Sequence, residues 1–198
     1  TQGGKMNKVK VFNWLWFHVV KFLVPLGKGI NGSRARMTVQ WFLADLFGGV
    51  GGVIFGDSNG AVLNNYRTMS KFDRIVLNLS VPGTTAHDWY YFFITPFGKK
   101  IRMKIWKCKH IINIGGNYIL LGFVEKADEG LRWLRTWFPT SFNCTIPPIN
   151  DVMLAKLCKI LKIKDQRIDP EYLKESVLQI NRTIKKYWGK QTIDLYKM

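Results

Sequence analysis

The segment DRIVLNLSVPGTTAHDWYYFFITPFGKKIRMKIWKCKHIINIGGNYILLGFVE, residues 73–125, decides the fold class that the sequence predicts. Its apolar residues recur with a period close to two, which indicates strands at residues 74–81, 89–95, 100–112 and 118–125. Short turns separate these strands, and they contain Pro82-Gly83, Pro96-Phe97-Gly98 and Gly115-Gly116-Asn117. Because such short connections join antiparallel neighbours, the segment predicts an antiparallel sheet.

The preceding segment adds a predicted β-hairpin. Residues 50–55 and 61–65 are mostly apolar and flank the turn-forming sequence Gly56-Asp57-Ser58-Asn59-Gly60. The sequence therefore predicts an α+β domain with an antiparallel sheet of about four to six strands in its middle. Across residues 41–126, the order of this hairpin, Asn64 and three antiparallel strands loosely resembles that of a PAS sensor domain.

Helices are predicted at both ends of the chain. Residues 8–24 carry apolar side chains at helical spacing and end at Pro25. They predict an amphipathic N-terminal helix that packs in a core or an interface, and the alternative is an anchor at a membrane surface. Two to three C-terminal helices are predicted at residues 127–138, at 151–163 and after Asp169, whose N-cap position precedes Pro170.

These elements divide the chain into three parts. Residues 1–37 hold the N-terminal helix and a basic, glycine-rich loop. Residues 38–138 form the predicted antiparallel-sheet core, and residues 139–198 form a helical C-terminal appendage.

The charge of the chain is strongly positive. Thirty Lys and Arg residues against thirteen Asp and Glu residues give a net charge of +17. Residues 1–124 hold sixteen of the basic residues and only four of the acidic ones. Because a charge this far from zero opposes compaction by self-repulsion, we expect a polyanionic partner, which is nucleic acid, an anionic membrane surface or an acidic protein. The alternative is a basic protein whose charge only keeps it soluble.

The strongest candidate for contact with that partner is the segment of residues 99–109, in which six of eleven residues are basic. On a strand, Arg102, Lys104 and Trp106 would share one face. Cations beside an aromatic ring are typical of surfaces that bind single-stranded nucleic acid. The alternative is an exposed strand that lysines keep soluble.

Two further segments extend this basic set. Residues 27–36 form a glycine-rich loop that could bring its cations to phosphates, with a plain basic linker as the alternative. Residues 132–137 combine Arg132 and Arg135 with two tryptophans; the default interpretation is core tryptophans with solvated arginines, and the alternative is a secondary basic and aromatic patch. The predicted nucleic-acid-binding residues are Lys28, Arg34, Arg36, Lys99, Lys100, Arg102, Lys104, Trp106, Lys107 and Lys109.

Catalytic and metal-binding patterns are weak in the sequence. Cys108 and His110 would share a strand face, but two ligands without a second pair do not predict a metal site. Three widely spaced cysteines form no disulfide framework and favour a reducing intracellular compartment or a virion over secretion. We expect no cofactor, no metal and no small-molecule substrate.

The sequence therefore favours a non-enzymatic basic subunit of a nucleoprotein assembly, such as a virion or a ribonucleoprotein, with nucleic acid and other protein subunits as partners. One alternative is a small DNA-processing enzyme of the homing-endonuclease type, although residues 42–49 depart from the LAGLIDADG pattern at the terminal acid. Another is a membrane-surface-associated subunit anchored by residues 8–24.

Overall fold

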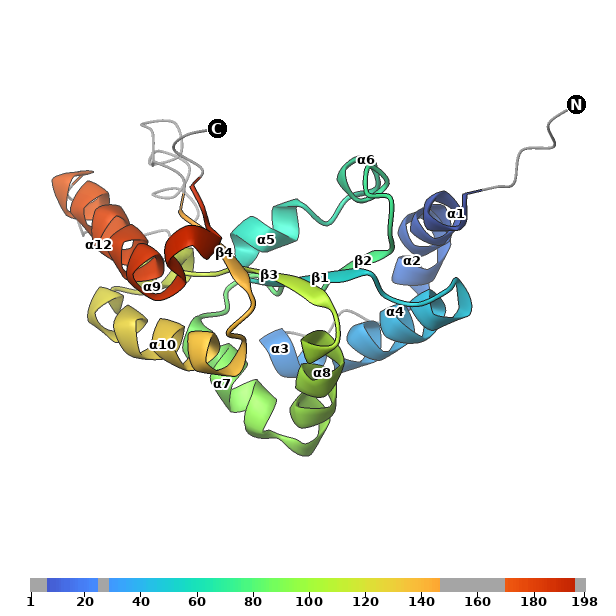
Figure 1. The fold of residues 1–198 in the computed structure, drawn as a ribbon, viewed down its shortest axis with the longest axis horizontal. Helices are drawn as coiled ribbons and strands as arrows, with labels where there is room; N and C mark the ends of the chain where they lie inside the picture. The colour runs from blue at the N-terminus through green and yellow to red at the C-terminus, as the bar shows by residue number, and fades with distance from the viewer. Residues whose placement is uncertain (1–6, 25–28, 147–169, 195–198) are drawn as a thin grey trace, which may run out of the picture.

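The computed structural model describes residues 7–24, 29–146 and 170–194 (Figure 1). Its centre is a five-stranded sheet with the strand order β2-β1-β3-β4-β5. Every strand pair is parallel. The strands are β1 (Gly52–Gly56), β2 (Val76–Asn78), β3 (Lys109–Asn113), β4 (Phe142–Cys144) and β5 (Thr192–Ile193).

The predicted antiparallel sheet is therefore wrong, because helices lie between strands that were expected to be neighbours. Residues 89–95 belong to α7 (Ala86–Ile94), and residues 100–112 are divided between α8 (Pro96–Trp106) and β3. Residues 118–125 begin inside α9 (Gly116–Leu120). A helical crossover joins parallel strands, so each misassigned helix also reversed the expected direction of the next strand.

Local capping explains why α7 and α8 are helices. Thr85 and Asp88 form a capping box at the start of α7, in which the Thr85 N–H donates to Asp88 Oδ2 over 2.7 Å. At the start of α8, Thr95 Oγ1 accepts a 3.0 Å hydrogen bond from the N–H of Gly98, and Pro96 occupies the first helical position. The sequence Pro96-Phe97-Gly98 is thus the first turn of a helix and not a turn between strands.

The predicted hairpin at residues 50–65 is also wrong. Residues 52–56 do form a strand, β1, but the chain continues into α5 (Ser58–Val62) and α6 (Tyr66–Met69) before it reaches β2. Asp57 is the N-cap of α5, where its side chain accepts a hydrogen bond from the Asn59 N–H. The parallel sheet removes the resemblance to a PAS domain, which depended on antiparallel strands.

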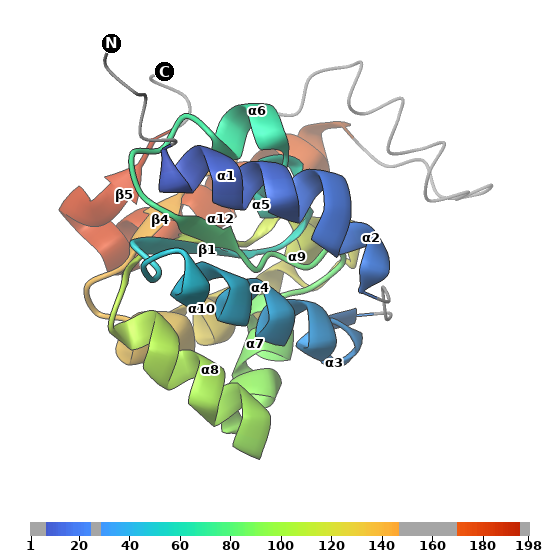
Figure 2. The same cartoon turned by 90° about the vertical axis from the view of Figure 1, so that its right-hand side faces the viewer.

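Helices cover both faces of the sheet (Figures 1 and 2). The N-terminal helix α1 (Lys8–Leu15) lies on the same face as α5 and α6. The opposite face carries α4 (Arg34–Leu46), α7, α8 and α10 (Ala127–Trp137). Alternation of strand and helix with both faces covered makes this a doubly wound parallel sheet.

The rest of the described N-terminal region is helical. After α1, the chain forms a π-helical turn at Trp16–Val20, then α2 (Lys21–Leu23) and α3 (Gly29–Gly32). The side chains of Phe12 and Trp16 are each 1% exposed and belong to the core. An N-terminal helix was thus predicted correctly, and its apolar face is used in folding. Within the described ranges, no helix is both long enough and apolar enough to cross a membrane.

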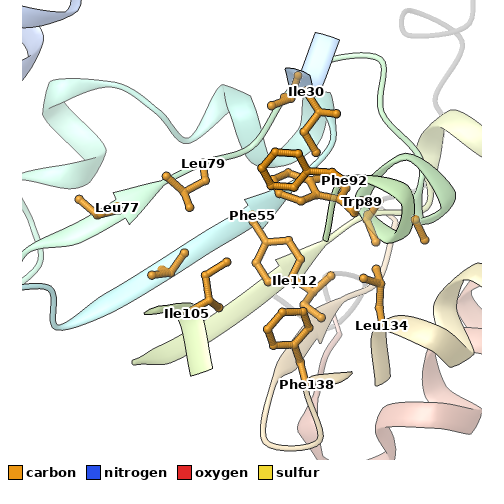
Figure 3. Packing of buried hydrophobic residues seen from close by; sticks show 14 of the residues in the cluster. Ile30, Phe55, Leu77, Leu79, Trp89, Phe92, Ile105, Ile112, Leu134 and Phe138 are labelled. Carbon is orange, nitrogen blue, oxygen red and sulfur yellow. The ribbon is translucent and has the colours of Figure 1, made fainter. Parts of the chain in front are cut away.

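The central core lies between β1 and the helices that pack on it (Figure 3). Phe55 of β1 is fully buried, and its ring centroid lies 5.0 Å from that of Trp89 and 5.1 Å from that of Phe138. Ile105 of α8 and Ile112 of β3 join the same cluster. These contacts fix α7 and α8 against the sheet.

The C-terminal part contributes helices and the last two strands. A 3₁₀ turn (Val124–Lys126) precedes α10, and α12 (Pro170–Trp188) is followed by a second 3₁₀ turn (Gly189–Gln191) and β5. The helices predicted at residues 127–138 and after Asp169 are therefore present, and the predicted helix at 151–163 lies outside the described residues. The buried stripe of Leu173, Val177, Ile180 and Ile184 on α12 packs into the core.

Candidate active site at the carboxyl edge of the sheet

The strand order creates a crevice at the carboxyl ends of β1 and β3. From β1 the chain crosses to β2 through α5 and α6, and from β2 it returns to β3 through α7 and α8. These two crossovers lie on opposite faces of the sheet (Figures 1 and 2). In open parallel sheets, ligands bind where the crossovers part in this way.

The turn after β1 carries the buried carboxylate of Asp57. Its Oδ1 accepts a 2.9 Å hydrogen bond from the N–H of Asn59, and its Oδ2 accepts bonds of 3.1 Å from the N–H groups of both Gly115 and Gly116. Asp57 thereby ties the turn after β1 to the turn after β3. Burial raises the pKa of this carboxyl, and the backbone donors act in the opposite direction.

Glycine is required where the two turns approach each other. A Cβ on Gly56 would lie 1.8 Å from the carbonyl oxygen of Asn113, so no other residue fits at the end of β1. A Cβ on Gly60 would lie 2.4 Å from Ser80 Oγ, which is buried without a hydrogen-bond partner among the described residues. Strands β1, β2 and β3 thus bring their carboxyl ends into direct contact.

Ser58 is the first residue of α5 and is partly exposed beside this buried network. In the described part of the chain, no hydrogen bond engages its hydroxyl or its backbone N–H. Gly56, Ser58 and Gly60 follow the pattern Gly-x-Ser-x-Gly on a strand-to-helix turn. In hydrolases with this pattern, the turn presents the serine hydroxyl as a nucleophile at the edge of a parallel sheet.

Asn117 follows the turn after β3 and adds a polar side chain at the same edge. It is 5% exposed, and its Nδ2 donates a 2.7 Å hydrogen bond to the carbonyl oxygen of Thr84, on the loop after β2. A carboxamide has a second N–H, and none of the bonds found in the described ranges uses it. Asn117 therefore braces this loop and keeps one N–H unbonded within the described part of the chain.

The three histidines make contacts with other residues. His87 on α7 contacts the Tyr118 hydroxyl at 2.7 Å through Nδ1 and Glu129 Oε2 at 3.5 Å through Nε2. His110 is buried beside Phe138, and His18 is exposed beside Tyr66. None of the hydrogen bonds among described residues joins a histidine to Ser58. No group of three or more metal-ligating side chains is present in that part of the chain.

A cavity of about 750 Å³ among the described residues lies away from this edge. Its lining includes Gly52, Val76 and Lys109, which stand at the amino ends of their strands. It also includes Cys108, whose thiol has its pKa raised by burial and by the nearby Asp45 carboxylate. A raised pKa makes this thiol a weaker source of the thiolate nucleophile.

The structure places the predicted basic residues at several positions. Lys28 lies outside the described residues, Arg34 and Arg36 are on the first turn of α4, and Lys109 begins β3. The other members of the 99–109 set are on α8 or directly after it, so their expected arrangement on a strand is wrong. Arg132 and Arg135 are on α10, and the Arg135 guanidinium lies over the ring of Trp188 at 5.9 Å.

The structure does bring part of this set together. On a helix, Arg102 and Trp106 are four residues apart and share a face. Together with Trp137 of α10 they line one groove. Arg34 contacts the start of the same helix, because its guanidinium lies 5.6 Å from the ring of Phe97 in the first turn of α8.

Sequence reasoning missed the carboxyl-edge residues Asp57, Ser58 and Asn117. The signal was present in the Gly-x-Ser-x-Gly spacing of residues 56–60 directly after an apolar strand. The same five residues are strong turn formers, so they were interpreted as the turn of a β-hairpin. No family model, curated protein or solved structure matches this chain.

Proposed function

We propose that this protein is an acyl-transfer enzyme of the ester-hydrolysing kind, with Ser58 as its nucleophile. The observation that carries the proposal is the placement of Ser58. It is the first residue of α5, in a Gly-x-Ser-x-Gly sequence that follows β1, at the point where the crossovers of a parallel sheet diverge. This proposal departs from the non-enzymatic role that composition favoured.

In the proposed reaction, Ser58 Oγ forms a bond to the acyl carbon of an ester, and the bond from that carbon to the leaving oxygen breaks. The serine proton passes to the leaving alkoxide. Water then attacks the acyl-serine ester, which releases the acid and restores the hydroxyl.

Two groups at the edge can stabilise the negative oxygen of the tetrahedral intermediate. One is the backbone N–H of Ser58, and the other is the second N–H of the Asn117 carboxamide. Donors fixed in advance at the position of a developing charge contribute strongly to acyl transfer. Asp57 acts as a positioning residue, because its hydrogen bonds from Asn59, Gly115 and Gly116 join the turn at Ser58 to the turn that precedes Asn117.

A fluorophosphonate probe tests the nucleophile directly, because it reacts covalently with serines that are activated. We expect the protein to be labelled at Ser58 in peptide mass spectrometry and to hydrolyse p-nitrophenyl acetate. Ser58→Ala should abolish labelling and lower hydrolysis at least about a hundredfold with an unchanged unfolding midpoint.

Ser70→Ala is the matched control, since Ser70 follows α6 and lies outside the carboxyl-edge network. It should leave labelling and hydrolysis unchanged. Labelling at another serine, or equal hydrolysis by the Ser58→Ala protein, would overturn the proposal. Asn117→Ala should lower the hydrolysis rate while fluorophosphonate labelling at Ser58 persists at a reduced rate.

A further inference from the structure

A groove between α8 and α10 combines exposed aromatic and basic side chains. It encloses about 400 Å³ and is lined by Arg102, Met103, Trp106, Lys107, Thr136 and Trp137. Trp106 is 62% exposed and Met103 is 64% exposed, although both belong to a helix that packs on the core through Ile101 and Ile105. Folding therefore does not require this face of α8 to be aromatic.

The aromatic rings of the groove are held in place. The indole N–H of Trp106 donates to the backbone carbonyl of Trp137. The Arg102 guanidinium lies 4.6 Å from the ring of Trp137, which stacks on Tyr90 at 4.8 Å with an angle of 7° between the planes. Tyr90 in turn stacks on Trp133 at 4.1 Å. Trp106 is thus an exposed ring that has little freedom left to lose on binding a ligand.

The α8 side of the groove is strongly basic. Helix α8 contains no acidic residue, and Lys99, Lys100, Lys104 and Lys107 are all exposed. Among described residues, the carboxylate bridged to this set is Asp45, which lies 3.7 Å from Lys104 Nζ. The other three lysines are available to neutralise an anion.

We propose that the groove between α8 and α10 binds single-stranded nucleic acid, with a base stacked on Trp106 and flanking phosphates paired with Lys99, Lys100 and Lys107. Base stacking on an aromatic side chain needs an unpaired base, which favours a single strand over a duplex. The cations then follow the backbone without reading its sequence. This binding is independent of the Ser58 chemistry, because the groove is formed by other elements.

Fluorescence anisotropy with a labelled 20-nucleotide oligo-dT, at several salt concentrations, tests the proposal on the full chain. We expect binding that weakens steeply with salt and exceeds binding to a duplex of the same length. Trp106→Ala should weaken binding about five- to a hundredfold, and Trp106→Phe should retain most of it because a ring remains. Trp14→Ala is the matched control, since Trp14 is 53% exposed on α1.

A pair of charge reversals separates a local site from the general charge of the protein. Lys99→Glu with Lys107→Glu should weaken binding and reduce the slope of log affinity against log salt by about 0.7 for each phosphate that is no longer neutralised. Lys8→Glu with Lys10→Glu makes the same change in net charge on exposed positions of α1 and should leave that slope unchanged. Fluorophosphonate labelling of Ser58 should be the same in both charge variants.

Three results would overturn the proposal. The first is the absence of Trp106-dependent oligo-dT binding, either because nothing binds or because Trp106→Ala leaves binding intact. The second is equal weakening by the two charge-reversal pairs, which would assign the affinity to net charge. The third is Trp106-dependent binding to phosphatidylserine vesicles without Trp106-dependent binding to oligo-dT, which would assign the groove to a membrane surface.

Discussion

Oδ2 of Asp57 accepts a 3.1 Å hydrogen bond from the N–H of Gly115, a residue 58 positions later in the chain. This bond joins the turn after β1 to the turn after β3, in the interior of the carboxyl edge. A short-range turn prediction cannot contain such a bond. Through this long-range bond, the segment Gly56-Asp57-Ser58-Asn59-Gly60 holds the ends of β1 and β3 together.

Replacement of Asp57 by asparagine should destabilise the protein. An asparagine has one acceptor oxygen in place of two, so its NH₂ group would face an N–H donor of Asn59, Gly115 or Gly116. We expect the free energy of unfolding, measured by urea titration at pH 7, to fall by about 1–3 kcal/mol. Asp73→Asn changes an exposed carboxylate and should lower it by less than about 0.5 kcal/mol. Equal decreases in the two variants would refute the bracing role of Asp57.

The two glycines at the ends of β1 should respond differently to alanine. At Gly56 the added Cβ meets the Asn113 carbonyl oxygen at 1.8 Å, and backbone must move to relieve the clash. At Gly52 the nearest atom is the Lys109 carbonyl oxygen at 3.4 Å, which is ordinary contact. Gly56→Ala should therefore lower the free energy of unfolding by more than about 2 kcal/mol, and Gly52→Ala by less than about 1 kcal/mol.

Thermal denaturation followed by circular dichroism measures the decrease in stability of the Gly56→Ala and Gly52→Ala proteins. A smaller decrease at Gly56 than at Gly52 would contradict the close approach of β1 and β3 at the carboxyl edge. A direct test of the same approach is hydrolysis by the Gly56→Ala protein at a temperature where it remains folded. Because Ser58 follows Gly56 closely in the chain, we expect the hydrolysis rate of the Gly56→Ala protein to fall as well.

Much of the sheet could not be predicted from local pattern alone. The apolar run at 50–55 correctly indicated β1, and Val76–Asn78 falls inside the predicted strand at 74–81. Neither run says which strand lies beside it, because parallel partners are separated by a whole crossover. The sheet direction therefore had to be inferred from turns, and three of those turns, at residues 56–60, 96–98 and 115–117, contain the first residue of a helix.

The helices α7 and α8 carried a local signal that the period of two obscured. Thr85 and Asp88 have the spacing of a capping box, and Thr95-Pro96 is an N-cap followed by a proline at the first helical position. Trp89, Phe92 and Phe93 are also spaced as one face of a helix. The aromatic residues at 89–93 favour strands by intrinsic propensity. They are nevertheless helical, and burial of Trp89, Phe92 and Phe93 against the sheet stabilises that helix.

The basic set was found by composition, but its geometry was not. The prediction placed Arg102, Lys104 and Trp106 on one strand face, whereas the helix separates Lys104 from the other two. Lys104 instead lies over Trp41 and beside Asp45 of α4. A count of charges identifies such a segment, and only its helical period identifies the side chains that line the groove.

Stability should depend on pH through His110. This side chain is 4% exposed, and burial lowers its pKa from the ordinary value near 6.5. As pH falls below about 6.5 the unfolded chain takes up a proton that the folded chain resists, so this contribution to stability is present above that pH and is lost below it. We expect the urea midpoint to fall between pH 7.5 and pH 5.

The His110→Gln variant identifies the residue responsible. Its midpoint should change less between pH 7.5 and pH 5 than that of the unchanged protein, whatever its absolute stability. His18→Gln, at an exposed position, should keep the full pH dependence. If both variants keep it, the titrating group is not His110.

The buried hydroxyl of Ser80 provides a last prediction and a second control for the active-site proposal. Ser80 Oγ is buried and has no hydrogen-bond partner among the residues that the structure describes, although its own N–H donates to Asn78 Oδ1 over 3.0 Å. Removal of an unpaired buried hydroxyl relieves a desolvation cost and leaves little space behind. Ser80→Ala should therefore leave the free energy of unfolding unchanged or raise it by up to about 1 kcal/mol.

Because Ser80 lies beside the Ser58 turn but carries no assigned chemistry, fluorophosphonate labelling at Ser58 should persist in this variant. Abolished labelling together with a gain in stability would show that the Ser80 hydroxyl takes part in the reaction.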